Sequence, residues 1–188
     1  MNAFHRWYCH SGRWRRVVQH DLVPWVTRDI KLGSRVLELG PGPGLTTEVL
    51  AKQVNQLVAV EIDTRSVERL QLTLKDADNV EVIQGDATDL TFDDESFSAA
   101  LCFTMLHHVP STEMQDRLLS EAHRILIHGG TFAGSDSTTS APFRAAHLFD
   151  TMVLVDPDQF GARLERAGFE NVLVDRASKA FRFRARKP

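Results

Sequence analysis

Short apolar runs alternate with amphipathic segments along most of the chain. Apolar runs bounded by turn residues are typical of buried strands, whereas apolar positions spaced i, i+3, i+4 are typical of helices. The runs predict strands at residues 36–39, 56–63, 79–84, 97–103, 131–135, 169–175 and 179–186. The amphipathic segments predict helices at residues 45–52, 64–75, 111–126 and 143–154, and a further helix that begins at Asp156-Pro157.

Strands and helices that alternate with short connections predict an open parallel sheet with helices on both faces. The last two strands follow each other without a helix between them, so they predict an antiparallel hairpin. In the final strand Phe181 and Phe183 alternate with Arg182 and Arg184, the pattern of a strand with one solvated face. Gly129-Gly130 is expected to end the helix that precedes strand 131–135.

The first 30 residues are rich in aromatic and basic side chains. Apolar residues follow an approximate helical stripe from Phe4 to Trp25, and Pro24 is expected to kink or end that helix. The helix can pack its aromatic face on the core, cover a binding cleft as a lid, or lie on a membrane surface. As a lid it would face a substrate with Tyr8, His10, Trp14 and Arg15. We expect a single domain over residues 1–188, with a helical cap at 1–30 and an α/β core at 31–188.

Charge is distributed unevenly along the 188 residues. The net charge is −3, but five arginines face two aspartates in residues 1–30, and residues 176–188 carry six basic residues and no acid. The intervening body therefore carries a net charge of −12. That body argues against a groove that tracks nucleic-acid phosphates. The basic ends are either solvated charge or a contact for an anionic substrate or lipid headgroups.

Cysteine content and hydropathy suggest where the protein resides. Cys9 and Cys102 form neither a CxxC pair nor a metal-binding spacing, and Cys102 lies in an apolar run. The N-terminal region has no uninterrupted apolar stretch of the kind found in signal peptides, and no run approaches the ~18 residues needed to span a membrane. We therefore expect a cytoplasmic protein without a metal site, for which peripheral membrane contact is the remaining lipid interaction.

A glycine-rich loop, Gly40-Pro41-Gly42-Pro43-Gly44, follows the first strand and opens a helix. Glycines at alternate positions remove Cβ atoms where a ligand must approach the backbone, and the helix N-terminus presents a positive dipole end. Such a loop can bind a nucleotide-like ligand at the carboxyl edge of a sheet. A tight turn without a ligand is the alternative for the loop taken alone.

Acidic residues stand at the ends of the next two strands. Glu61 follows Gly44 by seventeen residues, where a carboxylate can accept hydrogen bonds from both hydroxyls of a ribose and would repel a 2′-phosphate. Asp86 lies just past the third strand and could accept from an adenine amino group, or only close an Asx turn.

The ordered set of motifs resembles the class I S-adenosylmethionine-dependent methyltransferases, and within them the group of the ubiquinone and menaquinone methyltransferases. The resemblance covers about residues 35–135 and rests on VLELGPGPG (36–44), VAVEID (58–63), QGDA (84–87), FSAALCFTMLHHV (97–109) and EAHRILIHGG (121–130). It implies a Rossmann-like, seven-stranded, mostly parallel sheet of order 3-2-1-4-5-7-6 with strand 7 antiparallel. It also implies S-adenosylmethionine as the cofactor.

The resemblance assigns cofactor-binding roles to ten positions. Glycines of the loop would approach the methionine part, and Glu38 would hold its amino group directly or through water. Glu61 would bind the ribose, Ile62 would lie against the adenine, Asp86 would take the adenine amino group, and two residues would line the sulfonium. The full set is Glu38, Gly40, Gly42, Gly44, Glu61, Ile62, Asp86, Ala87, Phe103 and Thr104.

Methyl transfer from a sulfonium requires in-line positioning in a dry cleft, and a base where the acceptor is a hydroxyl or a carbon acid. His107 and His108 follow the fourth strand, where a base could stand; a packed or capping histidine pair is the alternative. His10 and His147 are weaker candidates. We expect a small acceptor of aromatic or lipid-like character, with the cap and residues 136–155 on its side.

Three rival interpretations remain. The GPGPG loop and VAVEID also resemble the ribosomal RNA adenine dimethylases, but Phe103-Thr104-Met105-Leu106 stands where those enzymes carry an Asn-Leu-Pro-Tyr-like motif. An NAD-dependent oxidoreductase would have a third glycine where Leu45 stands. A methyltransferase-like module that binds the cofactor without catalysis is the third.

Overall fold

The computed structural model describes residues 11–138 and 152–188. Ser11 caps the first described helix through its side chain, which accepts from the Trp14 N–H. Asp63, Ser111 and Asp156 cap the helices that begin at Thr64, Thr112 and Pro157 in the same way. The elements in chain order are α2 (Gly12–Val17), η1 (Val18–Leu22), α3 (Val23–Thr27), β1 (Arg35–Leu39), α4 (Leu45–Leu50), β2 (Gln56–Glu61), α5 (Thr64–Thr73), β3 (Val80–Gln84), β4 (Phe97–Phe103), η2 (Leu106–His108), α6 (Thr112–Ile125), β5 (Leu126–Ser137), α8 (Pro157–Arg166), β6 (Glu170–Arg176) and β7 (Ala180–Arg186).

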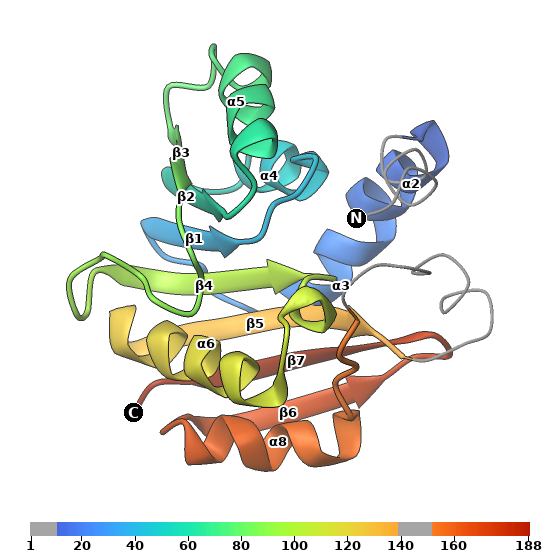
Figure 1. Ribbon diagram of the computed structural model, residues 1–188, viewed down its shortest axis with the longest axis vertical. Coiled ribbons are helices and arrows are strands. Elements are labelled where there is room, and N and C mark those ends of the chain that lie inside the picture. Colours follow the sequence, from blue (N-terminus) through green and yellow to red (C-terminus); the bar gives the residue numbers. More distant parts are fainter. Residues whose placement is uncertain (1–10, 139–151) are drawn as a thin grey trace.

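The strands form one seven-stranded sheet of order β3-β2-β1-β4-β5-β7-β6. The first five pair in parallel, and β7 runs antiparallel to both β5 and β6 (Figure 1). The predicted sheet, its order and the C-terminal hairpin are therefore confirmed. The chain adds β2 and β3 on one side of β1, and then β4 and β5 on the other side. In sheets of this kind ligands bind at the carboxyl ends of the two strands, here β1 and β4, between which this change of side occurs.

Successive residues of each central strand point to opposite faces, so the sheet carries two hydrophobic cores. Leu37, Val58 and Cys102 belong to the core that also contains residues of α6 and α8. Val36 and Leu101 belong to the core that also contains residues of η1, α3 and α4. Both faces of the strands are apolar for this reason, which explains why the sequence shows continuous apolar runs rather than alternation.

The N-terminal helical segment packs against the second of these cores. It continues past Pro24 to Thr27 and contains a π-helical stretch, η1, before the proline. Pro24 lies in the first turn of α3, where its missing N–H is best tolerated. Arg182 of β7 donates to the Trp25 carbonyl oxygen, and its guanidinium lies 5.6 Å from the Trp25 ring centroid. The N-terminal helical segment is thus held against β7 of the sheet. Predicted contacts of Phe4, Trp7 and Tyr8 lie outside the described residues.

The region from α6 to α8 differs most from the prediction. Helix α6 ends at Ile125 and Gly129-Gly130 belongs to β5, so the expectation that these glycines end the helix is wrong. The chain leaves the helix directly into an extended Leu126, and β5 is correspondingly longer than residues 131–135. Of the helix predicted at 143–154, residues 152–154 are not helical and the rest lies outside the described residues.

The part of the chain that the structure describes has no helix long and apolar enough to cross a membrane. Within the same residues no cluster of three or more histidine, cysteine, aspartate or glutamate side chains could hold a metal ion. Cys102 is fully buried in β4, and burial together with the nearby Asp136 carboxylate raises the pKa of its thiol well above the ordinary value. The thiol therefore behaves as a small apolar side chain, as predicted.

Candidate functional site

A cavity of about 490 Å³ opens at the carboxyl ends of β1, β2, β3 and β4. Its floor is the loop that follows each strand, and residues of α2, η1 and α6 complete its walls. Of the twelve residues predicted for the site, all except Glu38, Gly44 and His107 line this cavity, and these three lie beside it. The structure therefore brings together strand ends, from Leu39 of β1 to Phe103 of β4, that lie up to 64 residues apart in the sequence (103 − 39).

The glycine loop adopts a backbone that other residues rarely take. Gly40 and Gly44 have φ angles of +64° and +82°. A Cβ at Gly44 would stand 2.1 Å from Leu70 Cδ2, and one at Gly40 would stand 2.9 Å from Met105 Cε. The glycines thus serve two needs, because they permit left-handed backbone and they let α5 and the loop after β4 pack closely against the turn.

Glu61, at the end of β2, is the acid most firmly fixed at the cavity. It is 8% exposed, and its two carboxylate oxygens accept from the Gly42 N–H at 2.9 Å and from the Asp63 N–H at 3.0 Å. Each oxygen keeps a second lone pair for another donor. The carboxylate therefore joins the glycine loop to the start of α5 and presents its remaining acceptor capacity to the cavity.

Glu38, in β1, lies behind the loop and is 1% exposed. One oxygen, Oε1, accepts from the Thr46 hydroxyl, while Oε2 is buried without a hydrogen-bond partner. Burial raises the pKa of Glu38 to about 7, and the Thr46 hydrogen bond opposes that rise. Thr46 itself lines the cavity. An unpaired buried oxygen one hydroxyl away from a cavity is the arrangement expected where a cationic ligand approaches.

Asp86 and Ala87 follow β3 on the same side of the cavity. Asp86 Oδ1 accepts from both the backbone N–H and the hydroxyl of Thr88 at 2.8 Å, so this carboxylate does close an Asx-type turn. The turn uses Oδ1 and leaves the second oxygen for a ligand. Ile62, between these acids, also lines the cavity and is 65% exposed, an unusual exposure for a large apolar residue.

The end of β4 contributes Phe103 and Thr104. Phe103 is buried, and Thr104 has φ of +50°, a left-handed conformation that is strained for a β-branched residue. The Thr104 N–H donates to the Ser135 carbonyl oxygen at 2.8 Å, which holds the strained residue in place. Strain of this kind gathers at functional sites because the surrounding structure must maintain it.

The two histidines after β4 lie in different environments. His108 lines the cavity, whereas His107 is 2% exposed and does not. The His107 Nδ1 and backbone N–H both bind the carboxylate of Asp136, a fully buried residue of β5. The two imidazole rings are in contact, with centroids 4.2 Å apart. His108 is thus the histidine placed to touch a ligand.

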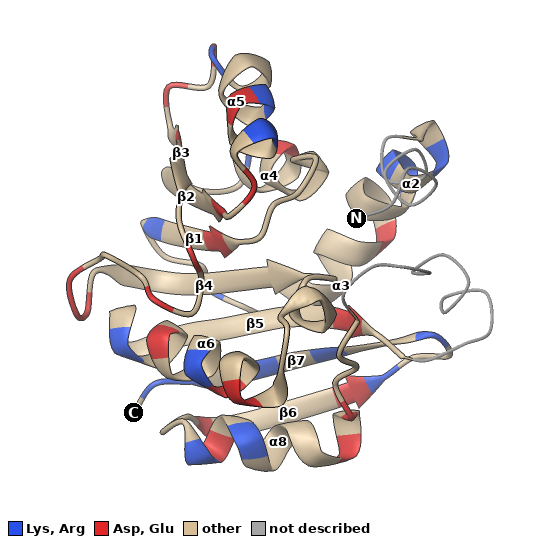
Figure 2. Ribbon diagram, in the orientation of Figure 1, with Lys and Arg blue, Asp and Glu red and all other residues tan. Residues whose placement is uncertain are grey.

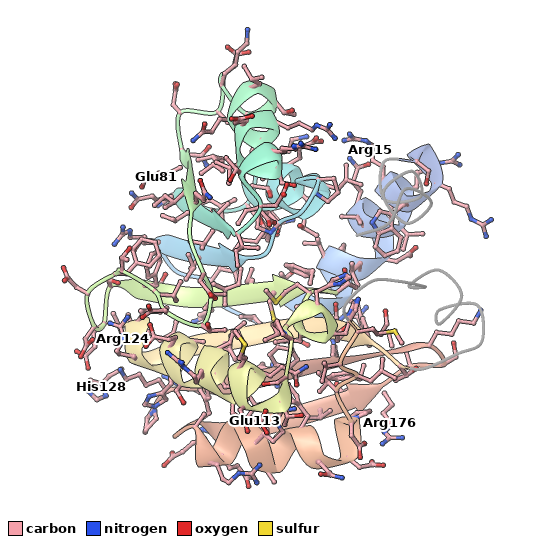
Figure 3. All side chains as sticks on the ribbon, viewed as in Figure 1. Arg15, Glu81, Glu113, Arg124, His128 and Arg176 are labelled. Atoms are coloured by element: carbon pink, nitrogen blue, oxygen red, sulfur yellow. The ribbon has the colours of Figure 1, made fainter. Side chains whose placement is uncertain are left out.

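The opposite wall of the cavity is apolar, and most of its members were not singled out in the sequence. Among the residues that the structure describes, no lysine or arginine lines this wall. Of the residues of this wall, only Trp14 was predicted to belong to a lid. Its neighbour Arg15 instead pairs with Glu48 of α4, on the side of α2 that faces α4 (Figure 3). Tyr8, His10 and His147 lie outside the described residues. The wall consists of Trp14, Val18, Leu22, Met105, Val109, Pro110 and Met114.

One part of this apolar wall can be recognised afterwards in the sequence. Trp14, Val18 and Leu22 are spaced i, i+4, i+8, so the stripe interpreted as core also forms the cavity wall. Asp136, by contrast, gave only a weak signal, an acid at the end of a buried strand. The long distance along the chain between His107 and Asp136 hides their pairing from any local pattern.

The arginine and lysine side chains of the described residues lie away from the cavity, whereas acidic side chains lie at it. Acidic residues mark the ends of β1 and β2, while basic residues concentrate on α2 and along β7 (Figure 2). At the opposite end of the sheet Arg124, labelled in Figure 3, donates to the Leu90 and Phe92 carbonyl oxygens and pairs with Asp94 and Glu121. These ion pairs fix the β3–β4 connection and leave the acids at the cavity as its distinctive charge.

Comparison with known proteins gives a consistent family match. The methyltransferase domain family matches residues 37–134, just over half of the chain. Among curated proteins, the ribosomal RNA small subunit methyltransferase A of Geobacter metallireducens is 42% identical over 66 residues, and that of Geobacter sulfurreducens is 48% identical over 58 residues. These matches cover 35% and 31% of this chain and 24% and 21% of the relatives. The matched regions thus span about a quarter of the length of the curated relatives.

Solved structures share the fold over much longer stretches. A SAM-dependent methyltransferase from Aquifex aeolicus superposes with a TM-score of 0.79 and 17% identity over all of both chains. Phosphoethanolamine N-methyltransferase 2 of Haemonchus contortus, solved with phosphomonomethylethanolamine and S-adenosylhomocysteine, superposes with a TM-score of 0.77 and 16% identity. That superposition covers 98% of this chain and 56% of the other. At these identities the likeness establishes the fold.

Proposed function

The chain belongs to the class I S-adenosylmethionine-dependent methyltransferases, and from that premise we propose that it methylates a small, largely apolar molecule. The observation that carries the proposal is the division of one cavity into two halves. One half carries the acids and glycines that suit the cofactor, and the other carries apolar side chains and His108. Within the family, we place the chain nearest to the ubiquinone and menaquinone methyltransferases.

The residues of the first half suit S-adenosylmethionine. The cofactor supplies an electrophilic methyl group on a sulfonium whose leaving thioether is neutral, so no acid has to protonate it. Glu61 would accept from the ribose hydroxyls, Asp86 from the adenine amino group, and exposed Ile62 would cover the adenine face. Glu38 would hold the amino group of the cofactor's methionine part through Thr46 or a water molecule. The unpaired Glu38 Oε2 and the left-handed glycine loop support this fit.

The second half supports an aromatic or lipid-like acceptor. Burial of apolar surface against Trp14, Met105 and Met114 would bind such a molecule and exclude water from the methyl-transfer path. Phe103 and strained Thr104 lie at the boundary of the halves, where the sulfonium would stand. His108 would accept a proton from an acceptor hydroxyl or carbon acid, and we assign residues 11–27 to the cap of this half.

A ribosomal RNA substrate is the second candidate, because the curated relatives named above act on ribosomal RNA by their names. Among the described residues, the apolar wall has no arginine or lysine, so it has no positive charge with which to bind the phosphates of RNA. The residues Phe103-Thr104-Met105-Leu106 also differ from the motif that grips an adenine amine in the dimethylases. A module that binds the cofactor without catalysis is the third candidate.

Three measurements on the same preparation separate these functions. Calorimetry should show micromolar-range binding of S-adenosylhomocysteine, and NADH should not compete. Labelled S-adenosylmethionine should then transfer its methyl group to the small-molecule fraction of a cell extract and not to ribosomal RNA. Label on the RNA alone would favour the second candidate, and binding without any transfer would favour the third. An absence of both binding and transfer would refute the proposal.

A further inference from the structure

We propose that Asp136 is a positioning residue for the acceptor half of the cavity, acting through His107 on His108. The inference rests on the proposed function, since it assigns a support to the histidine that the acceptor would meet. Asp136 lies on β5, whereas His107 and His108 lie in the loop after β4. Asp136 is fully buried and does not line the cavity, so any effect it has on a ligand must act through its neighbours.

The carboxylate of Asp136 binds the His107 residue at two points. Its Oδ2 accepts from the His107 backbone N–H at 2.9 Å, and its Oδ1 binds the His107 Nδ1. Oδ1 also accepts from the Ser137 N–H at 2.6 Å. Because an ionised carboxylate only accepts, the proton of a neutral His107 ring must lie on Nδ1. The pair therefore fixes the tautomer of the ring as well as the place of its backbone.

The same loop is held at two further points. Gln115 of α6 donates to the Leu106 carbonyl oxygen at 3.0 Å and to the Val153 carbonyl oxygen at 2.8 Å. The Val153 N–H donates to the His107 carbonyl oxygen at 2.8 Å. Helix η2 is thus fastened to β5, to α6 and to the segment before α8. Its last residue, His108, faces the cavity from this rigid support.

Contact between the two rings carries the restraint from Asp136 to the cavity. The ring centroids of His107 and His108 are 4.2 Å apart and the ring planes are inclined by 42°. A shift of the buried His107 ring would therefore displace the partly buried His108 ring. A base that is oriented by a second, buried group is a common arrangement in catalysis, because a small misplacement of the base slows proton transfer. Here the buried group acts through an intervening ring.

Asp136→Asn provides the first test, with Ser135→Ala as its control. Asparagine keeps the shape but replaces one carboxylate oxygen with an N–H₂ group, so it can no longer accept from the His107 backbone N–H, the His107 ring and the Ser137 N–H together. Ser135 precedes Asp136 on the same strand, is equally buried, points to the other face, and its hydroxyl has no partner. Long-range ¹H–¹⁵N spectra of the imidazoles should show the ring signals of both His107 and His108 shift in Asp136→Asn and stay unchanged in Ser135→Ala.

The second readout is function. Asp136→Asn should slow transfer of label from S-adenosylmethionine to the extract acceptor by about tenfold or more, while S-adenosylhomocysteine affinity stays within about twofold. Unchanged His108 signals, or transfer at the rate of Ser135→Ala, would overturn the proposal. The ring spectra require neither cofactor nor acceptor, so they remain decisive even if the chain proves not to transfer methyl groups.

A pair of substitutions at His107 covers the case in which Asp136→Asn does not fold. The amide nitrogen of asparagine falls near the position of an imidazole Nδ1, and that of glutamine near Nε2. His107→Asn should therefore keep the bond to Asp136 and hold η2, whereas His107→Gln should not. Greater transfer and more native-like His108 signals in His107→Asn than in His107→Gln would support the positioning role, and equal behaviour of the two would contradict it.

Discussion

The two halves of the cavity are built in opposite ways. The half assigned to the cofactor comes from consecutive strand ends between Glu38 and Asp86, and its carboxylates at residues 61 and 86 accept from backbone N–H groups of the adjoining loops. The half assigned to the acceptor gathers residues from α2, η1, the loop after β4 and α6. A polar ligand of fixed shape needs donors and acceptors at set distances, whereas an apolar ligand needs only shape and dryness. The first half can therefore be recognised as a motif, and the second cannot.

The largest expected effect is at Glu61, the centre of the polar half. Glu61→Ala should weaken S-adenosylhomocysteine binding by about a hundredfold or more, since two hydrogen bonds to a charged group, each worth about 1.5–3 kcal/mol, are lost. The substitution also releases the Gly42 and Asp63 N–H groups. Calorimetry gives the change in affinity.

The control for this substitution is Glu68→Ala, which removes the same charge from an exposed position of α5 that does not line the cavity. Its affinity should stay within about twofold of the original. If Glu61→Ala bound as tightly as Glu68→Ala, Glu61 would lose its ribose role.

The second prediction concerns the buried Glu38, whose pKa of about 7 lies above its ordinary value of 4.5. Between these two values the folded state holds a proton that the unfolded state has released, so this group makes the protein less stable as the pH rises through that window. Glu38→Gln should therefore raise the free energy of unfolding by up to about 3 kcal/mol at pH 8 and change it little at pH 4.5.

Urea unfolding at the two pH values measures this difference, with exposed Glu68→Gln as the matched control. Glu38→Gln should also bind S-adenosylmethionine more weakly, because it lacks the carboxylate proposed to hold the ammonium group of the cofactor. An effect of Glu38→Gln that is the same at both pH values would show that the pKa of Glu38 does not differ between the folded and unfolded states.

The third prediction compares two glycines of one loop. Gly44→Ala should be about 2 kcal/mol more destabilising than Gly42→Ala. Both positions have positive φ, at +82° and +54°, so both substitutions carry the left-handed penalty. Only at Gly44 would the new Cβ meet a neighbour, the 1% exposed Leu70, whereas nothing lies within 4 Å at Gly42. Thermal and urea unfolding of the pair should resolve the difference, and equal stabilities would indicate that α5 can move away from the loop.

The smallest effect is expected in the apolar half. Trp14→Ala should raise the KM for the extract acceptor by about tenfold, equivalent to about 1.4 kcal/mol, and leave S-adenosylhomocysteine affinity within about twofold. Trp25→Ala is the matched control, because Trp25 contacts Arg182 and does not line the cavity. A loss of cofactor affinity in Trp14→Ala with an unchanged acceptor KM would assign the cap to the cofactor half instead.

Most of the fold could be predicted because its signals are local. The strand ending at Phe103 was predicted to the residue, as buried parallel strands have a composition of their own. The start of α6 followed from its cap, Ser111. The predicted end of α6 at residue 126 is close to the observed Ile125, but the strand that follows was predicted to begin too late. Gly129-Gly130 resembles a helix stop, and the pairing of β5 with β4 and β7 overrides that local preference.

The sequence by itself determined the order of strands and helices, the glycine loop and the acids at the strand ends, since each depends on neighbours within a few residues. Only the tertiary structure decided that His108 lines the cavity while His107 binds Asp136, and that the stripe from Trp14 to Leu22 lines the same cavity. These arrangements join residues far apart in the chain. Which side chains meet there depends on how the helices pack across the sheet, and no local pattern records it.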